Sequence, residues 1–561
     1  MSLTKDNVAA YLPEMARQQP DAVAIYFPTS RTETVDGARR RRYDELTYRD
    51  LDRQSDEIAA GLLASGFAKG DRAALMVRPS PELFTLTFGL FKAGIVPVMI
   101  DPGLGRAGLK SCLERAAPSA FIGIPVAHAA RKVLGWGRGS VTRLVTVGRR
   151  WFWGGLTLEA VQEAGARVLA QGPGLEVAGA EDVAAILFTS GSTGPPKGVV
   201  YSHRSFVAQV ESIRELFGIE PGEVDLPTFP LFALFDPALG MTTVLPKMDA
   251  SKPAAVDPDE VLGPIERFGV TTLFGSPALL RTVGVEGARR ATALPGLRRV
   301  IAAGAPLPGE TMQLWHGMLS EEAALLPSYG ATECLPISCI DSHSILRETW
   351  PQTVDGYGVC VGSVVPTLRA EILALTDEPI ASWSDDLRAE PGVVGEIAVR
   401  GPMVTEEYFA DAGNTERAKI RSSDGIWHRM GDLGWRDEQG RLWFCGRKSQ
   451  RVGAGQETLF TVACEKVFDA VEGVRRTAVV GPQRKGRVEP TLCVELENAS
   501  RWGDVLPKLR EIRDGGARGH ARVDLIERFL QHSSFPVDVR HNAKLGREEL
   551  TVWAERVGSS R

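Results

Sequence analysis

Helical and strand patterns alternate regularly over the first hundred residues of this chain, and few folds accommodate that order. Residues 46–66 carry apolar side chains at helical spacing and precede a short β-type run at 71–77. Residues 83–94 and 95–101 repeat the same helix-then-strand order. Such alternation is typical of parallel sheets covered by helices. The sequence therefore predicts an α/β fold.

A chain of 561 residues is too long for a single compact core, so we expect several domains. Near residue 446 a turn-rich strand pair gives way to a compact helix, strand, strand, helix pattern of about 110 residues. We therefore predict an N-terminal domain at 1–446, made of stacked α/β subdomains with a β-rich part near 350–446. A small α+β lid is expected at 447–561.

Composition excludes several classes of protein. The formal net charge of -5 gives no broad attraction to nucleic acid or to an anionic membrane. The seven cysteines form no C-x-x-C pair, so neither a zinc site nor a disulfide framework is indicated. The N-terminus lacks a secretory pattern, and no apolar run is long enough to span a bilayer. We expect a cytoplasmic protein with no transmembrane segment.

Several common enzyme motifs are missing. The dipeptide Gly-Lys of a P-loop, a G-x-S-x-G elbow and an H-E-x-x-H pair do not occur. The stretch Gly103–Gly108 matches G-x-G-x-x-G, but no Asp or Glu lies between Glu114 and Glu159 to hold a ribose. We interpret these glycines as a loop rather than a nicotinamide site.

The loop "FTSGSTGPPKG" at 188–198 combines glycines, hydroxyls and a lysine. Glycine frees backbone N–H groups to form a concave donor surface, and Lys197 adds a positive charge. The loop is therefore expected to hold phosphate.

Six motifs, in this order, resemble the core motifs of the adenylate-forming superfamily: 188–206, 302–308, 327–333, 394–402, 428–447 and 539–550. That superfamily includes acyl-CoA synthetases, luciferases and peptide-synthetase adenylation domains. The resemblance implies that a substrate carboxylate attacks the α-phosphate of ATP, with Mg²⁺ present, to give an acyl-adenylate and pyrophosphate.

The resemblance also implies roles for individual residues. Lys544, Glu333, Thr332 and Lys197 would be catalytic, with Glu333 and Thr189 also at the metal. Lys544 would swing in to bridge nucleotide and carboxylate, although Ala543 replaces the glycine usual before it. The expected ATP-binding set is Thr189, Ser190, Gly191, Ser192, Thr193, Gly194, Gly304, Ala305, Pro306, Ser328, Tyr329, Gly330, Ala331, Asp432 and Arg447.

Two segments depart from the superfamily pattern. Many ligases place an aromatic residue or His after "PLF", whereas this chain has Ala233. The expected acyl-binding residues are Leu234, Phe235, Asp236, Gly275 and Ser276. The hinge segment is also unusual, with Lys448 or Ser449 as the expected pivot.

The sequence with these departures, above all "LFALFDPALGMTTVLPKMD" at 231–249 and "PVDVRHNAKLGREELTVWA" at 536–554, resembles the β-lactone synthetases of bacterial long-chain olefin biosynthesis. That resemblance implies adenylation of a long-chain 2-alkyl-3-hydroxy acid, followed by attack of its own 3-hydroxyl on the activated carbonyl, without CoA. Assembly with other enzymes of the olefin pathway is implied as well. The sequence identifies no base for the hydroxyl. The alternatives are a fatty-acid:CoA ligase, an acyl-AMP ligase loading a carrier protein, and a binding protein without turnover.

Overall fold

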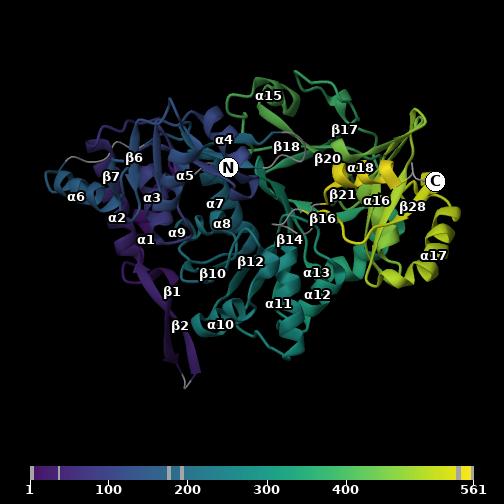
Figure 1. Cartoon of the computed structure of the whole chain (residues 1–561), viewed down its shortest axis with the longest axis horizontal. Helices are drawn as coiled ribbons and strands as arrows, with labels where there is room; N and C mark the ends of the chain where they lie inside the picture. Colours follow the sequence, from purple (N-terminus) through teal and green to yellow (C-terminus); the bar gives the residue numbers. More distant parts are fainter. Residues whose placement is uncertain (1–4, 36–37, 173–177, 190–194, 538–544, 558–561) are drawn as a thin grey trace.

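The computed structural model describes residues 5–35, 38–172, 178–189, 195–537 and 545–557. Figure 1 shows two large α/β regions that meet at the centre of the molecule, with a smaller unit at the end of the chain. The α/β class is confirmed by this arrangement, in which the parallel strands of two sheets are covered by helices.

The first sheet has seven strands in the order β7-β6-β5-β3-β4-β8-β9, and β8 and β9 form its antiparallel hairpin. All five residues of β4 are buried, as expected for a parallel strand covered on both faces. The strands are β3 Arg72–Met76, β4 Val96–Ile100, β5 Ala120–Gly123, β6 Arg143–Thr146, β7 Leu156–Thr157, β8 Val183–Thr189 and β9 Lys197–Ser202. The accompanying helices are α2 Tyr48–Ala64, α3 Pro81–Lys92, α4 Gly105–Ala116, α5 Pro125–Leu134 and α6 Leu158–Leu169.

The prediction of a loop at Gly103–Gly108 was wrong for most of its length. After a short 3₁₀ turn, helix α4 begins at Gly105 and includes Gly108. The helix forms because its apolar side chains recur at helical spacing, so that Cys112, Leu113 and Ala116 are buried on one side of it.

The second sheet has 14 strands, and its main path runs β17-β18-β20-β21-β16-β15-β14-β13-β12-β10-β11-β1-β2. Its parallel part consists of β1 Val23–Val35, β10 Val224–Pro227, β11 Thr242–Val244, β12 Thr272–Gly275, β13 Arg299–Ala302 and β14 Ala324–Ala331, with β2 Ala38–Thr47 antiparallel at the edge. The β-rich part expected near 350–446 continues this sheet through β15 Cys334–Cys339, β16 Val359–Val364, β17 Arg369–Leu373, β18 Gly395–Arg400, β19 Lys419–Ser422, β20 Gly425–Arg436 and β21 Leu442–Arg447.

A large apolar core lies around the N-terminal helices. It combines α1 Tyr11–Gln18, α2, α3 and α7 His203–Phe217, with buried residues such as Leu12, Ile58, Phe84 and Val207. Helix α7 thus anchors the hairpin that precedes it to the centre of the molecule. Short helices α8 Pro230–Ala233 and α9 Asp236–Leu239 pack at the edge of the same core.

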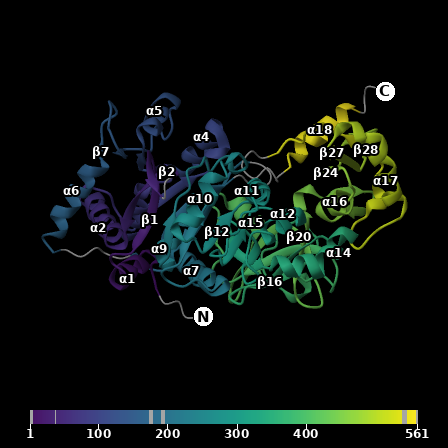
Figure 2. The ribbon, with the colours of Figure 1, turned by 90° about the horizontal axis from the view of Figure 1, so that it is seen from below.

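After Arg447 the chain forms its smaller unit, seen at the right of Figures 1 and 2. Its three-stranded sheet has the order β24-β27-β28, and helix α16 packs against β21 of the large sheet. The elements are β22 Val452–Ala454, β23 Glu457–Leu459, α16 Thr461–Asp469, β24 Val474–Val480, β27 Thr491–Leu496, α17 Trp502–Asp514, β28 Arg528–Gln531 and α18 Arg547–Val557. The mixed helix and strand content agrees with the α+β pattern read from the sequence; the boundary at 446/447 stays a prediction.

Candidate active site

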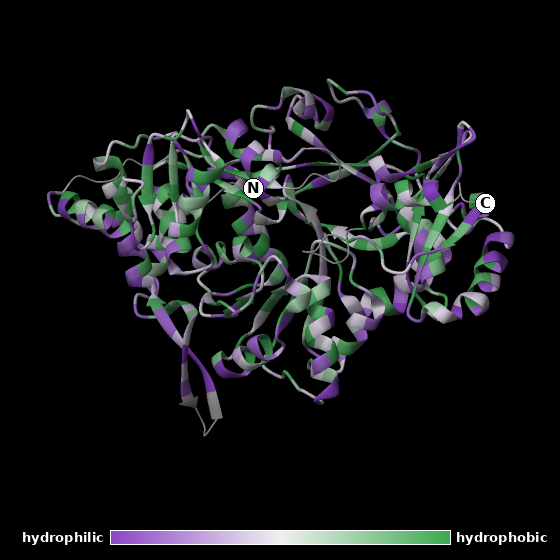
Figure 3. Ribbon diagram, in the orientation of Figure 1, coloured by the Kyte–Doolittle hydropathy of each residue, from purple (hydrophilic) through white to green (hydrophobic). Residues whose placement is uncertain are grey.

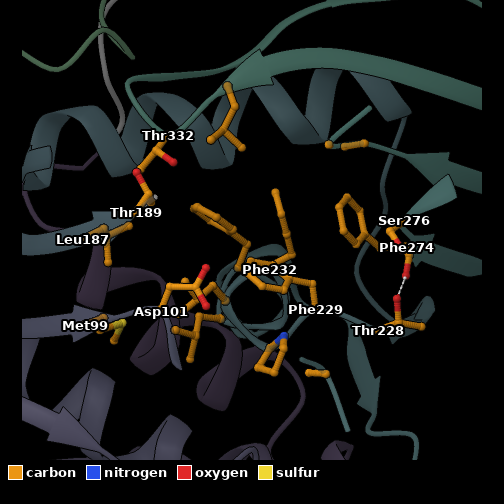
Figure 4. Close-up of a pocket in the computed structure, with 18 of the residues that line it drawn as sticks. Met99, Asp101, Leu187, Thr189, Thr228, Phe229, Phe232, Phe274, Ser276 and Thr332 are labelled. Carbon is orange, nitrogen blue, oxygen red and sulfur yellow. Dashed lines mark hydrogen bonds between the residues drawn. The ribbon is translucent and has the colours of Figure 1, made fainter. Parts of the chain in front are cut away.

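A cavity of about 1680 Å³ lies where the two large sheets meet. Pockets for drug-sized ligands are typically about 300–1,000 Å³, so this cavity has room for more than a nucleotide. Its wall includes the carboxyl ends of β4, β8, β10, β12, β13 and β14, the position at which α/β sheets bind ligands. Figure 4 shows Met99, Asp101 and Leu187 on one side of the cavity and Phe274 and Ser276 on the other.

The expected phosphate loop begins and ends at the cavity. Thr189 and Lys197 are paired across the mouth of the β8–β9 hairpin, and both line the cavity. The predicted residues Ser190, Gly191, Ser192, Thr193 and Gly194 lie outside the described residues. Lys197 Nζ lies 4.9 Å from the centre of the Tyr408 ring, so its charge faces the same space. Thr332 lies beside Thr189 at this edge (Figure 4).

Three predicted nucleotide residues from separate segments contact one another. Tyr329, in β14, donates from its hydroxyl to Asp432 Oδ2 at 2.7 Å. Asp432 and Arg447 are paired across β20 and β21, and Arg447 Nη1 lies 2.9 Å from Asp432 Oδ1. Burial raises the pKa of Asp432, while Arg447 and Tyr329 oppose that rise. The strand register therefore places Asp432 against Tyr329 and Arg447, which both line the cavity, whereas Asp432 itself is buried behind them and is outside the lining.

Glu333 follows β14 and lies in a cluster that sequence reasoning did not find. Tyr408 donates from its hydroxyl to Glu333 Oε1 at 2.6 Å, and Thr405 N donates to the Glu333 carbonyl at 3.0 Å. Burial lowers the pKa of Lys419 to about 8, opposed chiefly by Glu333. Tyr408 stands alone in "EEYFAD" with no motif around it, so nothing in the sequence identifies it as a neighbour of Glu333 and Lys197.

Not every predicted residue reaches the cavity. Gly304 lines it together with Ser328, Gly330 and Ala331, but Ala305 and Pro306 are outside its lining. Gly275 is likewise outside the lining, whereas Ser276 lines the cavity and caps helix α11 Pro277–Arg289. Ala303 and Gly304, which directly follow β13, line the cavity, and Ala305 and Pro306 lie further along the same loop.

Aromatic side chains form the other end of the cavity. Phe232 stacks on Phe274 with ring centroids 4.1 Å apart, and Phe235 meets Phe206 edge-on at 6.1 Å. Phe206 in turn stacks on Tyr201 at 4.5 Å. The predicted acyl residues Leu234, Phe235 and Asp236 all line this end. Ala233 is fully buried, so it contributes packing rather than a side chain in the cavity.

Two buried carboxyl groups, Asp225 and Asp236, lie against this apolar end. Asp236 Oδ2 accepts a hydrogen bond from Thr243 Oγ1 at 2.8 Å. Burial raises the pKa of Asp236 to about 8, and burial together with repulsion from Asp236 raises that of Asp225. Both pKa values are therefore shifted in the direction that favours the protonated carboxyl group.

Two histidines of the core motifs, His203 and His428, lie away from the cavity; His541 is outside the described residues. His203 is buried against Phe91 with ring centroids 5.8 Å apart, and burial lowers its pKa to about 4. His428 is also buried, and burial lowers its pKa well below the ordinary value. Neither side chain lines the cavity. A structural role fits both.

The segment after β21 is attached to the large sheet. Lys448 Nζ lies 3.0 Å from Glu396 Oε2, which also accepts from Arg429 at 2.6 Å. Ser449 is exposed and follows directly. Lys544 lies outside the described residues. Its segment leads into α18, which begins at Arg547, and that arginine donates to the buried Glu465 at 2.8 Å.

None of the helices in the described part of the chain combines the length and apolar character that crossing a bilayer demands.

Comparison with known proteins places these observations in context. The AMP-binding enzyme family matches residues 12–409. The chain is 50% identical over 554 residues to the olefin β-lactone synthetase of Stenotrophomonas maltophilia, with 98% of each chain covered. It is 49% identical over 559 residues to the olefin β-lactone synthetase of Xanthomonas campestris, covering 98% of this chain and 97% of the relative. In fold it is similar to the anthranilate CoA ligase AuaEII in complex with anthranoyl-AMP, with a TM-score of 0.77 and 18% identity over 100% of this chain and 99% of that one.

Proposed function

We propose, from the premise that this chain belongs to the AMP-binding enzyme family and to its olefin β-lactone synthetases, that it converts a long-chain 2-alkyl-3-hydroxy acid into a β-lactone. The reaction uses ATP and releases AMP and pyrophosphate. The observation that carries this proposal is the identity of about half of all residues over nearly the whole chain. The continuous cavity, polar at one end and aromatic at the other, supports it.

In the first step a carboxylate oxygen of the substrate attacks the α-phosphorus of ATP and pyrophosphate leaves. Lys197 and Thr332 would stabilise the charge on the phosphates, and Lys544 would bridge the nucleotide and the carboxylate. Asp432 would accept from the ribose hydroxyls, held in place by Arg447 at 2.9 Å. Tyr329 would lie against the base.

Magnesium fits the donor set at this end of the cavity. Glu333 Oε1 is occupied by Tyr408, which leaves Oε2 and the Thr189 hydroxyl as hard oxygen donors. Among the described residues no cluster of three metal-binding side chains occurs. A single carboxylate combined with phosphate oxygens is how Mg²⁺ is usually held with nucleotides. When bound, the ion would neutralise phosphate charge.

In the second step the 3-hydroxyl oxygen attacks the acyl carbon, the hydroxyl proton is released and AMP leaves. The chain contributes confinement, because an apolar wall restricts the substrate and excludes water from the activated carbonyl. Phe232, Phe235 and Leu234 would form that wall on one side. No thiol takes part, so CoA is not required.

The direct test is mass spectrometry of the products from purified enzyme, ATP, Mg²⁺ and a long-chain 2-alkyl-3-hydroxy acid, with and without CoA. The expected product is lighter than the acid by one water and forms without CoA. If the carboxyl group carries ¹⁸O, one labelled oxygen should appear in AMP. A product that forms only with CoA, heavier by the thioester increment, would assign the chain to the acyl-CoA ligases instead.

We further propose that the protein works in the cytoplasm, since all seven cysteines are free and a reducing compartment suits free thiols. Assembly with other enzymes of olefin synthesis is also proposed. Its support is chemical: an intermediate with two long alkyl chains dissolves poorly in water.

A further inference from the structure

We propose that an exposed basic and aromatic face on the first α/β region binds the surface of an anionic lipid bilayer. The face, which we call the α5 face, consists of Val126, Lys132, Val133, Arg149, Arg150, Trp151 and Phe152. It is formed by one side of helix α5 and by the loop between β6 and β7. Both elements lie on the half of the molecule opposite the C-terminal unit (Figures 1 and 2).

The apolar side chains of the α5 face are unusually exposed. Val133 is 83% exposed, Phe152 71%, Val126 57% and Trp151 52%. Isolated exposed apolar residues are common on protein surfaces, but a group of this kind marks an interaction site. Tryptophan and phenylalanine are the residues that insert at the boundary between lipid headgroups and acyl chains. Figure 3 shows the ribbon coloured by hydropathy over these elements.

The surrounding charge has one sign. From Arg115 to Leu158 the chain contains seven Lys or Arg residues, Arg115 included, and no Asp or Glu. Two of the seven, Arg115 and Arg143, are paired with Asp411 and Asp71. Lys132, Arg138, Arg149 and Arg150 are exposed. Within the described part of the chain none of these four is paired with a carboxylate: Lys132 lies 4.9 Å from the Phe152 ring centre, and Arg150 donates to the Gly155 carbonyl. Although the net charge of the whole chain is -5, this segment is positively charged.

The loop is held in place rather than hanging free. Trp153, between the exposed aromatics and the sheet, is buried and stacks on His128 of α5 at 5.2 Å. Its indole N–H donates to Thr146 Oγ1 at 2.9 Å. Trp151 lies 5.3 Å from Trp153. This anchoring keeps Trp151 and Phe152 presented to solvent next to α5, which is the preorganisation that a docking surface needs.

The α5 face lies directly behind one wall of the active-site cavity. Ile124 and Ala127, at the start of α5, line the cavity together with Leu109 of α4, whereas Val126 points outward. A bilayer bound to the face would thus lie one helix away from the cavity. A substrate with two alkyl chains partitions into lipid, so binding there would raise its local concentration. This gain in substrate concentration rests on the proposed function, whereas the proposed lipid binding itself does not.

Charge favours a bilayer over a protein as the occupant. Exposed cations around apolar side chains match the negative potential of anionic headgroups. Protein interfaces are depleted in lysine, whereas Lys132 lies over Phe152 within this face.

The test is co-flotation of the purified full-length chain with vesicles. Vesicles of phosphatidylcholine mixed with phosphatidylglycerol should carry the wild-type chain, and vesicles of phosphatidylcholine alone should carry much less. The double variant Trp151→Ser/Phe152→Ser should weaken vesicle binding on the order of tenfold. Arg149→Ser/Arg150→Ser should weaken it by a similar factor at low salt, and at high salt this variant should bind like the wild type.

Matched controls remove the same groups elsewhere. Val285→Ser/Val393→Ser takes two exposed valines, 48% and 52% exposed, from other surfaces, and Arg289→Ser/Arg290→Ser removes two exposed arginines from α11. These variants should bind vesicles like the wild type. All variants of the α5 face should keep wild-type turnover of detergent-dispersed substrate, which separates this proposal from the proposed function.

Two results would overturn the proposal. One is a wild-type chain that does not float with anionic vesicles. The other is binding that the α5-face variants and the control variants share equally. If the wild-type chain instead self-associates and Trp151→Ser/Phe152→Ser makes it monomeric, the face is a protein interface and not a lipid-binding surface.

Discussion

The two ends of the cavity are built in different ways. At the nucleotide end, polar residues from short motifs at strand ends are fixed by hydrogen bonds and ion pairs, as in the contacts of Asp432 with Tyr329 and Arg447. At the acyl end, Phe232, Phe235 and Phe274 are fixed by ring packing between segments far apart in the sequence. Hydrogen bonds constrain direction as well as distance, whereas apolar packing constrains mainly volume.

This difference teaches where activity and specificity reside. A polar site tolerates little change, because a donor or acceptor displaced by an ångström no longer makes its bond. An apolar site accepts changes that preserve volume. We therefore expect substitutions at the nucleotide end to reduce turnover with every substrate. Substitutions at the acyl end should instead change which acids are accepted.

The largest effect is expected for Lys544→Ala. Loss of the charge that bridges nucleotide and carboxylate should lower ATP–pyrophosphate exchange by about 10²–10³-fold, while ATP still binds. Equilibrium binding of ATP and the exchange rate are measured on the same preparation. Lys485→Ala removes an exposed lysine from the same C-terminal unit and should change neither quantity. Equal loss of binding and exchange would contradict the role assigned to Lys544.

The buried carboxyl pair gives the acyl end its own pH dependence. Because the fold raises the pKa of Asp236 to about 8, the folded chain keeps a proton that the unfolded chain releases near its ordinary value. Stability is therefore fully present below about pH 4 and is lost as pH rises through about 8, by at most about 1.4 kcal/mol per pH unit for each proton.

Urea unfolding at a series of pH values between these limits measures that slope. Asp236→Asn keeps the acceptor for Thr243 but cannot ionise, so it should flatten the slope. Asp249→Asn is the control: Asp249 also lines the cavity, but hydrogen bonds from Ser251 lower its pKa, so its effect has the opposite sign and lies at lower pH. A slope unchanged in Asp236→Asn would show that the pair does not titrate as described.

The two ends of the cavity differ in how much of their lining has a local signal in the sequence, and the reason is physical. Motifs such as "SYGATE" fix residues on one strand end, so Tyr329, Thr332 and Glu333 line the cavity as expected. Tyr408 was missed, because its contact with Glu333 joins positions 75 residues apart without any local pattern. At the acyl end, Leu234, Phe235 and Ser276 line the cavity, but nothing local could identify Met99 or Leu187 on the facing sheet. Helix α4 also formed where glycines had suggested a loop, since burial of its apolar side overrode their local preference.

A smaller effect is expected when the pair at the nucleotide end is loosened. Arg447→Ala leaves Asp432 buried with only Tyr329 as partner, which should raise its pKa further and weaken ATP binding by about tenfold, or about 1.4 kcal/mol. The Arg447 side chain is 31% exposed, so solvent screens part of the loss. Arg447→Lys keeps the charge and should recover part of the affinity. Calorimetric titration with ATP measures both variants. Unchanged ATP affinity in Arg447→Ala would show that the ion pair between Arg447 and Asp432 does not contribute to ATP binding.

The smallest effect, and the sharpest contrast between the two ends, is expected for Phe232→Ala. Its ring stacks on Phe274 at 4.1 Å, and such aromatic pairs contribute about 0.5–1.5 kcal/mol. The half-buried side chain lines the acyl end, so KM for long-chain acids should rise about three- to tenfold while ATP affinity stays unchanged. A double-mutant cycle with Phe274→Ala isolates the contribution of the pair, because each single change removes the same contact. Short-chain acids, which do not reach these rings, should respond little to either change. If Phe232→Ala lowered ATP affinity as much as it raised KM for the acid, the two ends would not be separable, and the cavity would have to be treated as one coupled site.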